Sequence, residues 1–281
     1  MKTPNDEFLR TGEPHVVKLP PILRDKRHRE PSVFSPENLL REARRQKSLP
    51  RRSVPRVCVL DPDGDIVRML LKEKRAERDP SWACYHTDLY TFSLRGRKIG
   101  IIGCAVGASF AVLLAEELFA AGCGLLISVT SSGQIMKTAD PPYFILIEKA
   151  LRDEGTSYHY LPPSDFSRMP PRLSQALRGG LARISPPVLR GSTWTTDAPF
   201  RETAYAIERC RALGIAAVEM EAAALYAFAS ARNKPVVCLA HVTNQMAQIK
   251  GDFEKGAANG AHDALIVIAA VARKLNGREA L

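Results

Sequence analysis

Short apolar runs rich in β-branched residues alternate with longer stretches of helical periodicity from Val54 onward. Strands are predicted at 54–60, 98–104, 123–130, 215–220 and 234–243. Helices are predicted at 109–122 and 201–214, with Gly122 and Gly214 as C-terminal caps, and at 262–277, with Lys and Arg in the last turn. Strands that alternate with helices favour right-handed crossovers. The sequence therefore predicts an α/β fold, a three-layer sandwich with a mixed, mainly parallel central sheet.

The first part of the chain differs from the rest in charge. Residues 1–56 hold 14 Lys or Arg against 7 Asp or Glu, which gives +7 of the formal net charge of +10. A basic arm can bind nucleic acid or an acidic membrane surface. This one lacks interleaved aromatic residues and any recognised nucleic-acid module, which favours a solvated or neighbour-packed arm. We expect an arm over 1–53, one α/β domain over 54–281 and no specific nucleic-acid partner.

The composition excludes several classes of protein. The 281 residues are 45% hydrophobic, which is ample for a core, yet every long apolar run is interrupted by Gly, Ser or Glu, so no membrane partner is expected. The N-terminus has acidic residues and no apolar stretch typical of a secretory signal, which favours a cytoplasmic location. The six cysteines lie singly, so no metal site is expected. No nucleotide-binding glycine motif is present, and no organic cofactor is expected.

Two carboxylates, Glu219 and Glu221, stand in the otherwise uncharged stretch 216–229. A spacing of two in a strand places both side chains on one side, at the point where strand composition changes to helix composition. One interpretation is N-terminal capping of an ordinary helix. The other is a pocket at the carboxyl end of a parallel strand, where the two hydroxyls of a sugar diol would satisfy a carboxylate and Met220 would form an apolar floor.

The segment VEMEAAALYAFA at 218–229 resembles the signature segment of the nucleoside phosphorylase superfamily, which contains purine nucleoside phosphorylase, uridine phosphorylase and related nucleosidases. Other segments are similar to the family's in the expected order: GCAVGASFAVLLAEELFAAGC, SVTSSGQI, RDEGTSYHY, GSTWTTDAPFRET and AHVTNQM. This ordered set covers about residues 57–275. The resemblance implies a nucleoside phosphorylase-like catalytic domain over 54–281, inorganic phosphate as co-substrate, a nucleoside as substrate, and a homo-oligomer, either a dimer or a trimer of dimers.

The resemblance also implies roles for single residues. Met220 and Glu221 would contact the ribose with Glu219 in support, and Ser131 would touch both ribose and phosphate. Hydroxyls and backbone amides after a strand suit an anionic oxygen, although TSSG alone is a commonplace turn. The other candidates for binding phosphate are Gly103, Ser132 and Arg68.

A second polar loop offers the chemistry that a nucleobase needs. Thr196 and Asp197 supply acceptors, Phe200 a stacking face and Arg201 a forked donor. The alternative is an Asx-type turn that feeds a helix near Arg201. The family places its aromatic residue one position earlier, where this chain has Pro199, so stacking by Phe200 implies a shifted loop.

The loop after the last predicted strand carries the candidate for assisting the leaving base. The family uses Asp or Arg there, and the aligned residue is Asn244, which we expect to act with Glu221 in catalysis. An amide can stabilise negative charge that develops on a pyrimidine, but it is no general acid. His241 lies three residues upstream and is typical of a core or surface histidine.

The chain departs from the family where phosphate-binding arginines are expected. Gly64 and Ser128 stand at two of those positions, the third falls near Tyr85 or His86, and Leu60 replaces a family Gly. Arg68, Arg95, Arg97 or an arginine of the arm would have to substitute. Three hypotheses follow: phosphorolysis of a nucleoside to free base and ribose 1-phosphate, as in uridine phosphorylase; hydrolysis on the same scaffold; or nucleoside binding without catalysis.

Overall fold

The computed structural model describes residues 19–181, 184–245, 251–253 and 255–275. Its strands are β1 (Val57–Asp61), β2 (Ala76–Arg78), β3 (Tyr90–Leu94), β4 (Arg97–Gly103), β5 (Leu125–Gln134), β6 (Tyr143–Asp153), β7 (Phe166–Arg168), β8 (Val188–Thr196), β9 (Ala217–Glu219) and β10 (Val236–Asn244). Its α-helices are α1 (Pro36–Gln46), α2 (Asp65–Lys72), α3 (Ala108–Ala120), α4 (Pro171–Ala176), α5 (Ala204–Ala212), α6 (Ala222–Arg232) and α7 (Ala261–Leu275). Short 3₁₀ turns lie at Pro21–Leu23, Thr156–His159, Pro199–Arg201 and Ala257–Gly260.

The strands form one mixed sheet in the order β10-β6-β8-β9-β5-β1-β4-β3-β2, with β7 on β6 and a further pairing of β10 with β5. The pairs β1–β4, β1–β5, β10–β5, β6–β8 and β8–β9 are parallel, and they make up the centre of the sheet. Antiparallel pairs lie mainly toward the edges, as in the β3–β4 hairpin. The predicted α/β class with a mixed central sheet is confirmed.

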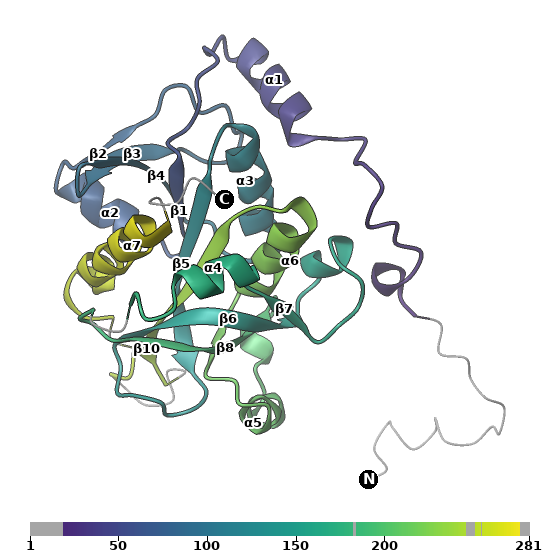
Figure 1. Cartoon of the computed structure of the whole chain (residues 1–281), viewed down its shortest axis with the longest axis vertical. Helices are drawn as coiled ribbons and strands as arrows, with labels where there is room; N and C mark the ends of the chain where they lie inside the picture. Colours follow the sequence, from purple (N-terminus) through teal and green to yellow (C-terminus); the bar gives the residue numbers. More distant parts are fainter. Residues whose placement is uncertain (1–18, 182–183, 246–250, 254, 276–281) are drawn as a thin grey trace.

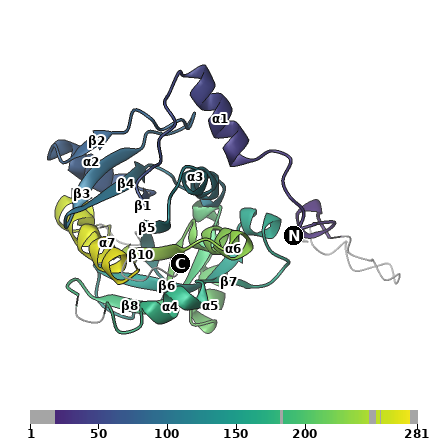
Figure 2. The same ribbon diagram turned by 45° about the horizontal axis from the view of Figure 1, so that its top comes forward.

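Helices cover both faces of this sheet (Figure 1). α2 and α7 pack together on one face, while α3 and α6 pack together on the other (Figure 2). α6 is buried almost throughout, from Ala222 to Ala229, which explains why it is apolar on every side. None of the helices in the described part of the chain is long and apolar enough to cross a membrane.

The arm is anchored along part of its length. Ser35 accepts a hydrogen bond from the Asn38 amide and caps α1, and Leu40 and Ala43 of α1 are buried in the main core, where α1 contacts α3. The second half of the arm is therefore a packed helix. Residues 1–18 lie outside the described residues, and the domain boundary at 53 stays a prediction.

The sheet gathers polar residues at one edge, because the carboxyl ends of neighbouring parallel strands meet there. The register pairs Asp61 of β1 with Gly103 of β4. It also pairs His241 of β10 with Ser131 of β5, and Glu219 of β9 with Thr195 of β8. Sequence segments that are far apart thus supply one site, which we call the carboxyl-end site.

Candidate active site

Glu219 caps α6 from inside the protein. Its Oε2 accepts hydrogen bonds from the backbone amides of Glu221 and Ala222, both at 2.7 Å. Its Oε1 accepts from the hydroxyls of Thr193, at 3.0 Å, and Thr195. Burial raises the pKa of Glu219, and these donors oppose that effect. Four donors already bind the Glu219 carboxylate. We therefore expect Glu219 to support Glu221 and not to contact the ribose directly.

Glu221 is held differently, although it is equally buried, with 1% of its surface exposed. Its Oε1 accepts a 2.7 Å hydrogen bond from the backbone amide of Gly107, whereas Oε2 is buried without a hydrogen-bond partner among the described residues. Burial, followed by the charge of Glu219, raises the pKa of Glu221 to about 8, while the Gly107 amide and the nearby Thr130 hydroxyl act in the opposite direction without satisfying Oε2 in good geometry. An orphan acceptor of this kind is costly unless a ligand satisfies it.

Ser131, predicted to contact phosphate and ribose, instead directs both of its donors at a carboxylate of the chain. The Ser131 amide donates to Asp63 Oδ2 at 2.8 Å, and its hydroxyl donates to Asp63 Oδ1 at 2.9 Å. Lys255 Nζ lies 3.4 Å from Asp63 Oδ1 and 2.7 Å from Asp65 Oδ2. A cation and two donors therefore surround Asp63 much as they would surround a phosphate oxygen.

The Arg68 side chain lies over Gly64, the residue that stands where the family has an arginine. Gly64 has a φ of +75°, and a Cβ there would lie 2.8 Å from Arg68 Nη1, so the glycine makes room for the guanidinium. Arg68 Nη2 donates to Asp65 Oδ1 at 2.7 Å and to the Asp63 carbonyl at 2.6 Å. Its Nη1 lies 3.8 Å from Cys104 Sγ, beside the glycine-rich turn. Arg68 is thus close to the predicted phosphate site but paired with acids.

Acidic groups dominate this corner. Burial raises the pKa of Asp61 to about 7, while the Val67 amide donates to its Oδ2 at 2.9 Å. Burial alone would raise the pKa of Asp65, but hydrogen bonds from Lys255 and Arg68 lower it. Asp63 and Lys255 were not predicted as site residues. The DPDGD run of three acids was the available signal.

Asn244, which we expect beside the leaving base, is buried at the end of β10 together with His241. Asn244 is 5% exposed, and its Nδ2 donates to Thr243 Oγ1 at 3.0 Å. The His241 ring stacks on Phe144 with ring centroids 4.4 Å apart. Burial, followed by the charge of Lys255, lowers the pKa of His241 to about 4, so the ring is neutral at neutral pH. Its core placement agrees with the structural interpretation of His241.

The predicted base loop separates into an anchored part and an exposed part. Thr196 is buried, and its hydroxyl accepts from the Ala198 amide at 3.1 Å in an Asx-like turn. Asp197 Oδ2 accepts from the Gly155 amide at 2.8 Å. Phe200 is 99% exposed and Arg201 is exposed, so the isolated chain does not bring these two to the carboxyl-end site. Stacking by Phe200 stays a prediction.

The remaining candidates lie near the same edge. Met220 is half-buried between the two glutamates, and Gly103 ends β4, where a Cβ would lie 3.0 Å from a methyl of Val67. The Ser132 hydroxyl is buried without a hydrogen-bond partner among the described residues. Arg95 and Arg97, by contrast, lie at the opposite end of β4 and do not replace the missing phosphate arginines.

Comparison with known proteins agrees with this architecture. The fold is that of solved nucleoside phosphorylases. It is similar to uridine phosphorylase from Vibrio fischeri ES114 in complex with 6-hydroxy-1-naphthoic acid, with 20% identity, a TM-score of 0.67, and coverage of 80% of this chain and 93% of that one. It is also similar to purine nucleoside phosphorylase from Toxoplasma gondii in complex with immucillin-H, with 16% identity, a TM-score of 0.67, and coverage of 83% and 94%.

The sequence itself places the chain in a family. Residues 56–273 match the family described as the phosphorylase superfamily. No curated protein matches the chain. The chain belongs to the phosphorylase superfamily, as its ordered motifs indicated.

Proposed function

We propose that this protein cleaves the N-glycosidic bond of a nucleoside, with Glu221 gripping the pentose. The observation that carries the proposal is the buried Oε2 of Glu221, which has no partner among the described residues while Oε1 is fixed by Gly107. A ribose hydroxyl is a donor that would satisfy this oxygen. Membership of the phosphorylase superfamily supports the same chemistry.

The arrangement of charges suits a dissociative cleavage. As the base leaves with the bonding electrons, C1′ becomes an oxocarbenium-like centre, and a carboxylate near the ribose hydroxyls stabilises the positive charge. Because the pKa of Glu221 is about 8 in the empty site, its carboxyl is mostly protonated at neutral pH. Positive charge that develops at C1′ favours the ionised form, so the interaction strengthens in the transition state. Asn244 would donate an amide hydrogen bond to the departing base.

The predicted acceptor is inorganic phosphate, which gives free base and ribose 1-phosphate. Ser131, Ser132, the turn at Gly103 and Arg68 would hold it. In support, the Arg68 guanidinium lies beside Gly64 and close to Cys104 of the glycine-rich turn. Phosphate binding would require Asp63 to leave the amide and hydroxyl of Ser131.

Hydrolysis is the second candidate, and one observation favours it. The Asp63 carboxylate already accepts from both donors of Ser131, and Asp61 and Asp65 lie in the same run. A phosphate dianion would meet like charge here, whereas a neutral water molecule would not. Water would then capture C1′ and the product would be free ribose.

A product assay tests the function and separates the two acceptors. The purified full chain is incubated with purine and pyrimidine nucleosides with and without phosphate, and free base, ribose and ribose 1-phosphate are measured. Base release only with phosphate supports phosphorolysis, and release of ribose without phosphate supports hydrolysis. Binding of a nucleoside with no release of base under either condition would refute both.

Several predictions accompany this function. A homo-oligomer, a cytoplasmic location and the absence of any cofactor other than phosphate are part of the proposal. Sedimentation of the purified chain measures the first. Activity of protein treated with a chelator, compared with untreated protein, measures the last.

A further inference from the structure

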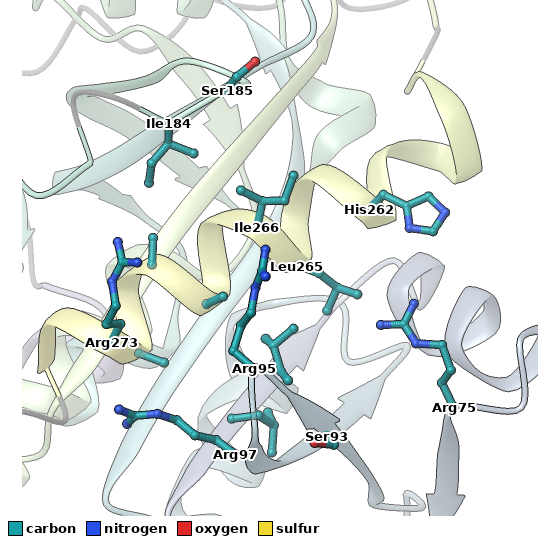
Figure 3. A pocket seen from close by; sticks show the side chains of 15 residues that line it. Arg75, Ser93, Arg95, Arg97, Ile184, Ser185, His262, Leu265, Ile266 and Arg273 are labelled. Atoms are coloured by element: carbon teal, nitrogen blue, oxygen red, sulfur yellow. The ribbon is translucent and has the colours of Figure 1, made fainter.

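A groove of about 900 Å³ runs along α7 on the side of the β3–β4 hairpin. We call it the arginine groove, because it is lined by Arg75, Arg95, Arg97 and Arg273 together with His262. Figure 3 shows these side chains arriving from three places: the start of β2, the hairpin and α7. In this view Arg95 extends from the hairpin toward Ile266 of α7.

The groove is separate from the carboxyl-end site. Arg97 begins β4 and Gly103 ends it, so these two residues lie about 20 Å apart at roughly 3.3 Å per residue. The two regions come closest at the start of α7, where His262 of the groove follows Ala261 of the carboxyl-end site. α7 likewise begins next to Gly260, beside His241, and reaches Arg273 only in its last turn. The residues that line the groove and those around Asp63 do not overlap.

The groove carries a surplus of positive charge. Arg75 Nη1 is paired with Glu73 Oε2 at 2.7 Å, and the same carboxylate lies 3.4 Å from His262 Nε2. Within the described residues, no carboxylate forms an ion pair with the other three arginines, which are Arg95, Arg97 and Arg273. An anion is therefore the ligand that this electrostatic field favours.

The hairpin holds two of these arginines in place. Arg95 and Gly96 both have positive φ, 51° and 76°, as a two-residue turn that matches strand twist requires. Arg95 is part of the turn and Arg97 directly follows it. The Arg97 side chain lies on the same side of β4 as Ile99, which also lines the groove. The hairpin thus fixes the backbone from which both guanidinium groups extend, and the planar guanidinium fork matches the geometry of phosphate oxygens.

An apolar floor lies among the arginines, formed by Leu94, Ile99, Ile184, Leu265 and Ile266. Ile266 is 43% exposed, which leaves apolar surface that a ligand in the groove would cover. The volume of the groove is that of a small-molecule site. The arginines surround this single hollow, whereas a nucleic-acid backbone requires a stripe of charge along the surface.

We propose that the arginine groove binds a nucleoside polyphosphate as a ligand distinct from the substrate of the carboxyl-end site. The phosphates pair with Arg95, Arg97 and Arg273, since the forked guanidinium matches phosphate oxygens. The base and sugar cover Ile266 and the floor beside it. A nucleoside polyphosphate would contact both the arginines and the apolar floor of the groove, whereas free phosphate would contact the arginines alone.

Fluorescence anisotropy of an N-methylanthraniloyl-ATP probe with the full chain tests the proposal. Arg97→Glu is compared with Lys98→Glu, which makes the same charge change one residue away, on a side chain that does not line the groove. We expect the probe to bind at least about tenfold more weakly to the first variant and within about twofold of wild type to the second. Arg95→Gln with Arg97→Gln serves as a milder pair if the charge reversal fails to fold.

Competition separates this site from the nucleoside site. ATP should displace the probe, adenosine and inorganic phosphate should displace it much less, and Glu221→Gln should bind it as wild type does. Equal loss in Arg97→Glu and Lys98→Glu, or displacement by adenosine as effective as by ATP, would overturn the proposal. A changed sedimentation coefficient in Arg97→Glu with unchanged probe binding would overturn it too, because the groove would then be a subunit interface. None of these results depends on catalysis.

Discussion

The two ends of β4 carry opposite charge. At Gly103 the strand ends among Asp61, Asp63 and Asp65, in the place where a phosphate was predicted. At Arg97 it begins beside Arg95 and Arg273, and none of these three arginines forms an ion pair within the described structure, whereas Arg75 pairs with Glu73. A chain with a net charge of +10 thus presents acid to the expected phosphate site and base to a groove at the other end.

This difference shows that net charge and motif order do not locate an anion site. Side chains from β1, β5 and the segment before α7 decide the charge at the carboxyl end, and an internal carboxylate takes the donors of Ser131. Substitutions at each end test whether the two regions have separate ligands.

The largest effect is expected from Glu221→Gln. Removing the carboxylate that would meet the pentose should lower kcat/KM for the best nucleoside about 100-fold, since a hydrogen bond to a charged group is worth about 1.5–3 kcal/mol. Steady-state kinetics measures the loss. Glu208→Gln, on an exposed side chain of α5, is the matched control and should keep full activity. Full activity of Glu221→Gln with its fold intact would refute the pentose contact.

The next effect concerns Asp63. Asp63→Ala frees the amide and hydroxyl of Ser131 and leaves Lys255 nearby, so affinity for inorganic phosphate should rise about tenfold, as expected when a like charge is removed. Isothermal titration calorimetry measures this without any catalytic assay. Asp140→Ala, at an exposed side chain, should leave phosphate affinity unchanged. Tight phosphate binding by wild type that Asp63→Ala fails to improve would contradict the role given to Asp63.

A smaller difference is expected from salt. Raising the salt concentration from about 0.05 M to about 0.5 M shortens the screening length, so probe binding in the exposed arginine groove should weaken several-fold. Binding of an uncharged nucleoside at the carboxyl-end site should change little. Parallel titrations at both salt concentrations measure the two. If both ligands showed the same salt dependence, the proposed electrostatic difference between the arginine groove and the carboxyl-end site would be wrong.

The last expected effect is on stability. The Glu221 carboxyl ionises near 4.5 in the unfolded chain and near 8 in the folded one, so between these values the folded state binds a proton that the unfolded state lacks. Wild type therefore loses stability as pH rises through this window. Glu221→Gln lacks this loss, which is about 4 kcal/mol over about three pH units, so its Tm relative to wild type should rise by roughly 7–8 °C between about pH 5 and pH 8. Thermal unfolding at both pH values measures the shift, and a constant difference would contradict the raised pKa.

Strands with continuous apolar runs were predictable, and strands with internal polar positions were not. β5 and β10 were both anticipated, because their first residues are uniformly buried and aliphatic. β6 is the exception: its first half, Tyr143–Ile147, is a continuous buried apolar run, but it was missed because the Pro pair at 141–142 before it is typical of a loop. β8 was missed because Thr193 and Thr195 face inward to serve Glu219, so the buried side carries hydroxyls instead of apolar groups.

The site was predictable to the extent that its residues lie close together in the sequence. Glu219 and Glu221 stood out as charges in an apolar stretch. That Glu219 is a helix cap and Glu221 an open acceptor depends on Thr195 and Gly107, which lie far away in the sequence. Lys255 was not predictable, because its partner Asp65 is 190 residues away. The same holds for the arginine groove, which combines three distant segments.

The Gly107–Glu221 hydrogen bond gives the protein an internal reporter. One carboxylate oxygen grips the loop before α3 and the other is the proposed contact for a sugar, so occupancy of the second alters the electron density available to the first. The Gly107 amide should therefore change its NMR chemical shift and its rate of hydrogen exchange when a pentose arrives. A single backbone proton thus signals whether the active site is filled, even for compounds that are never turned over.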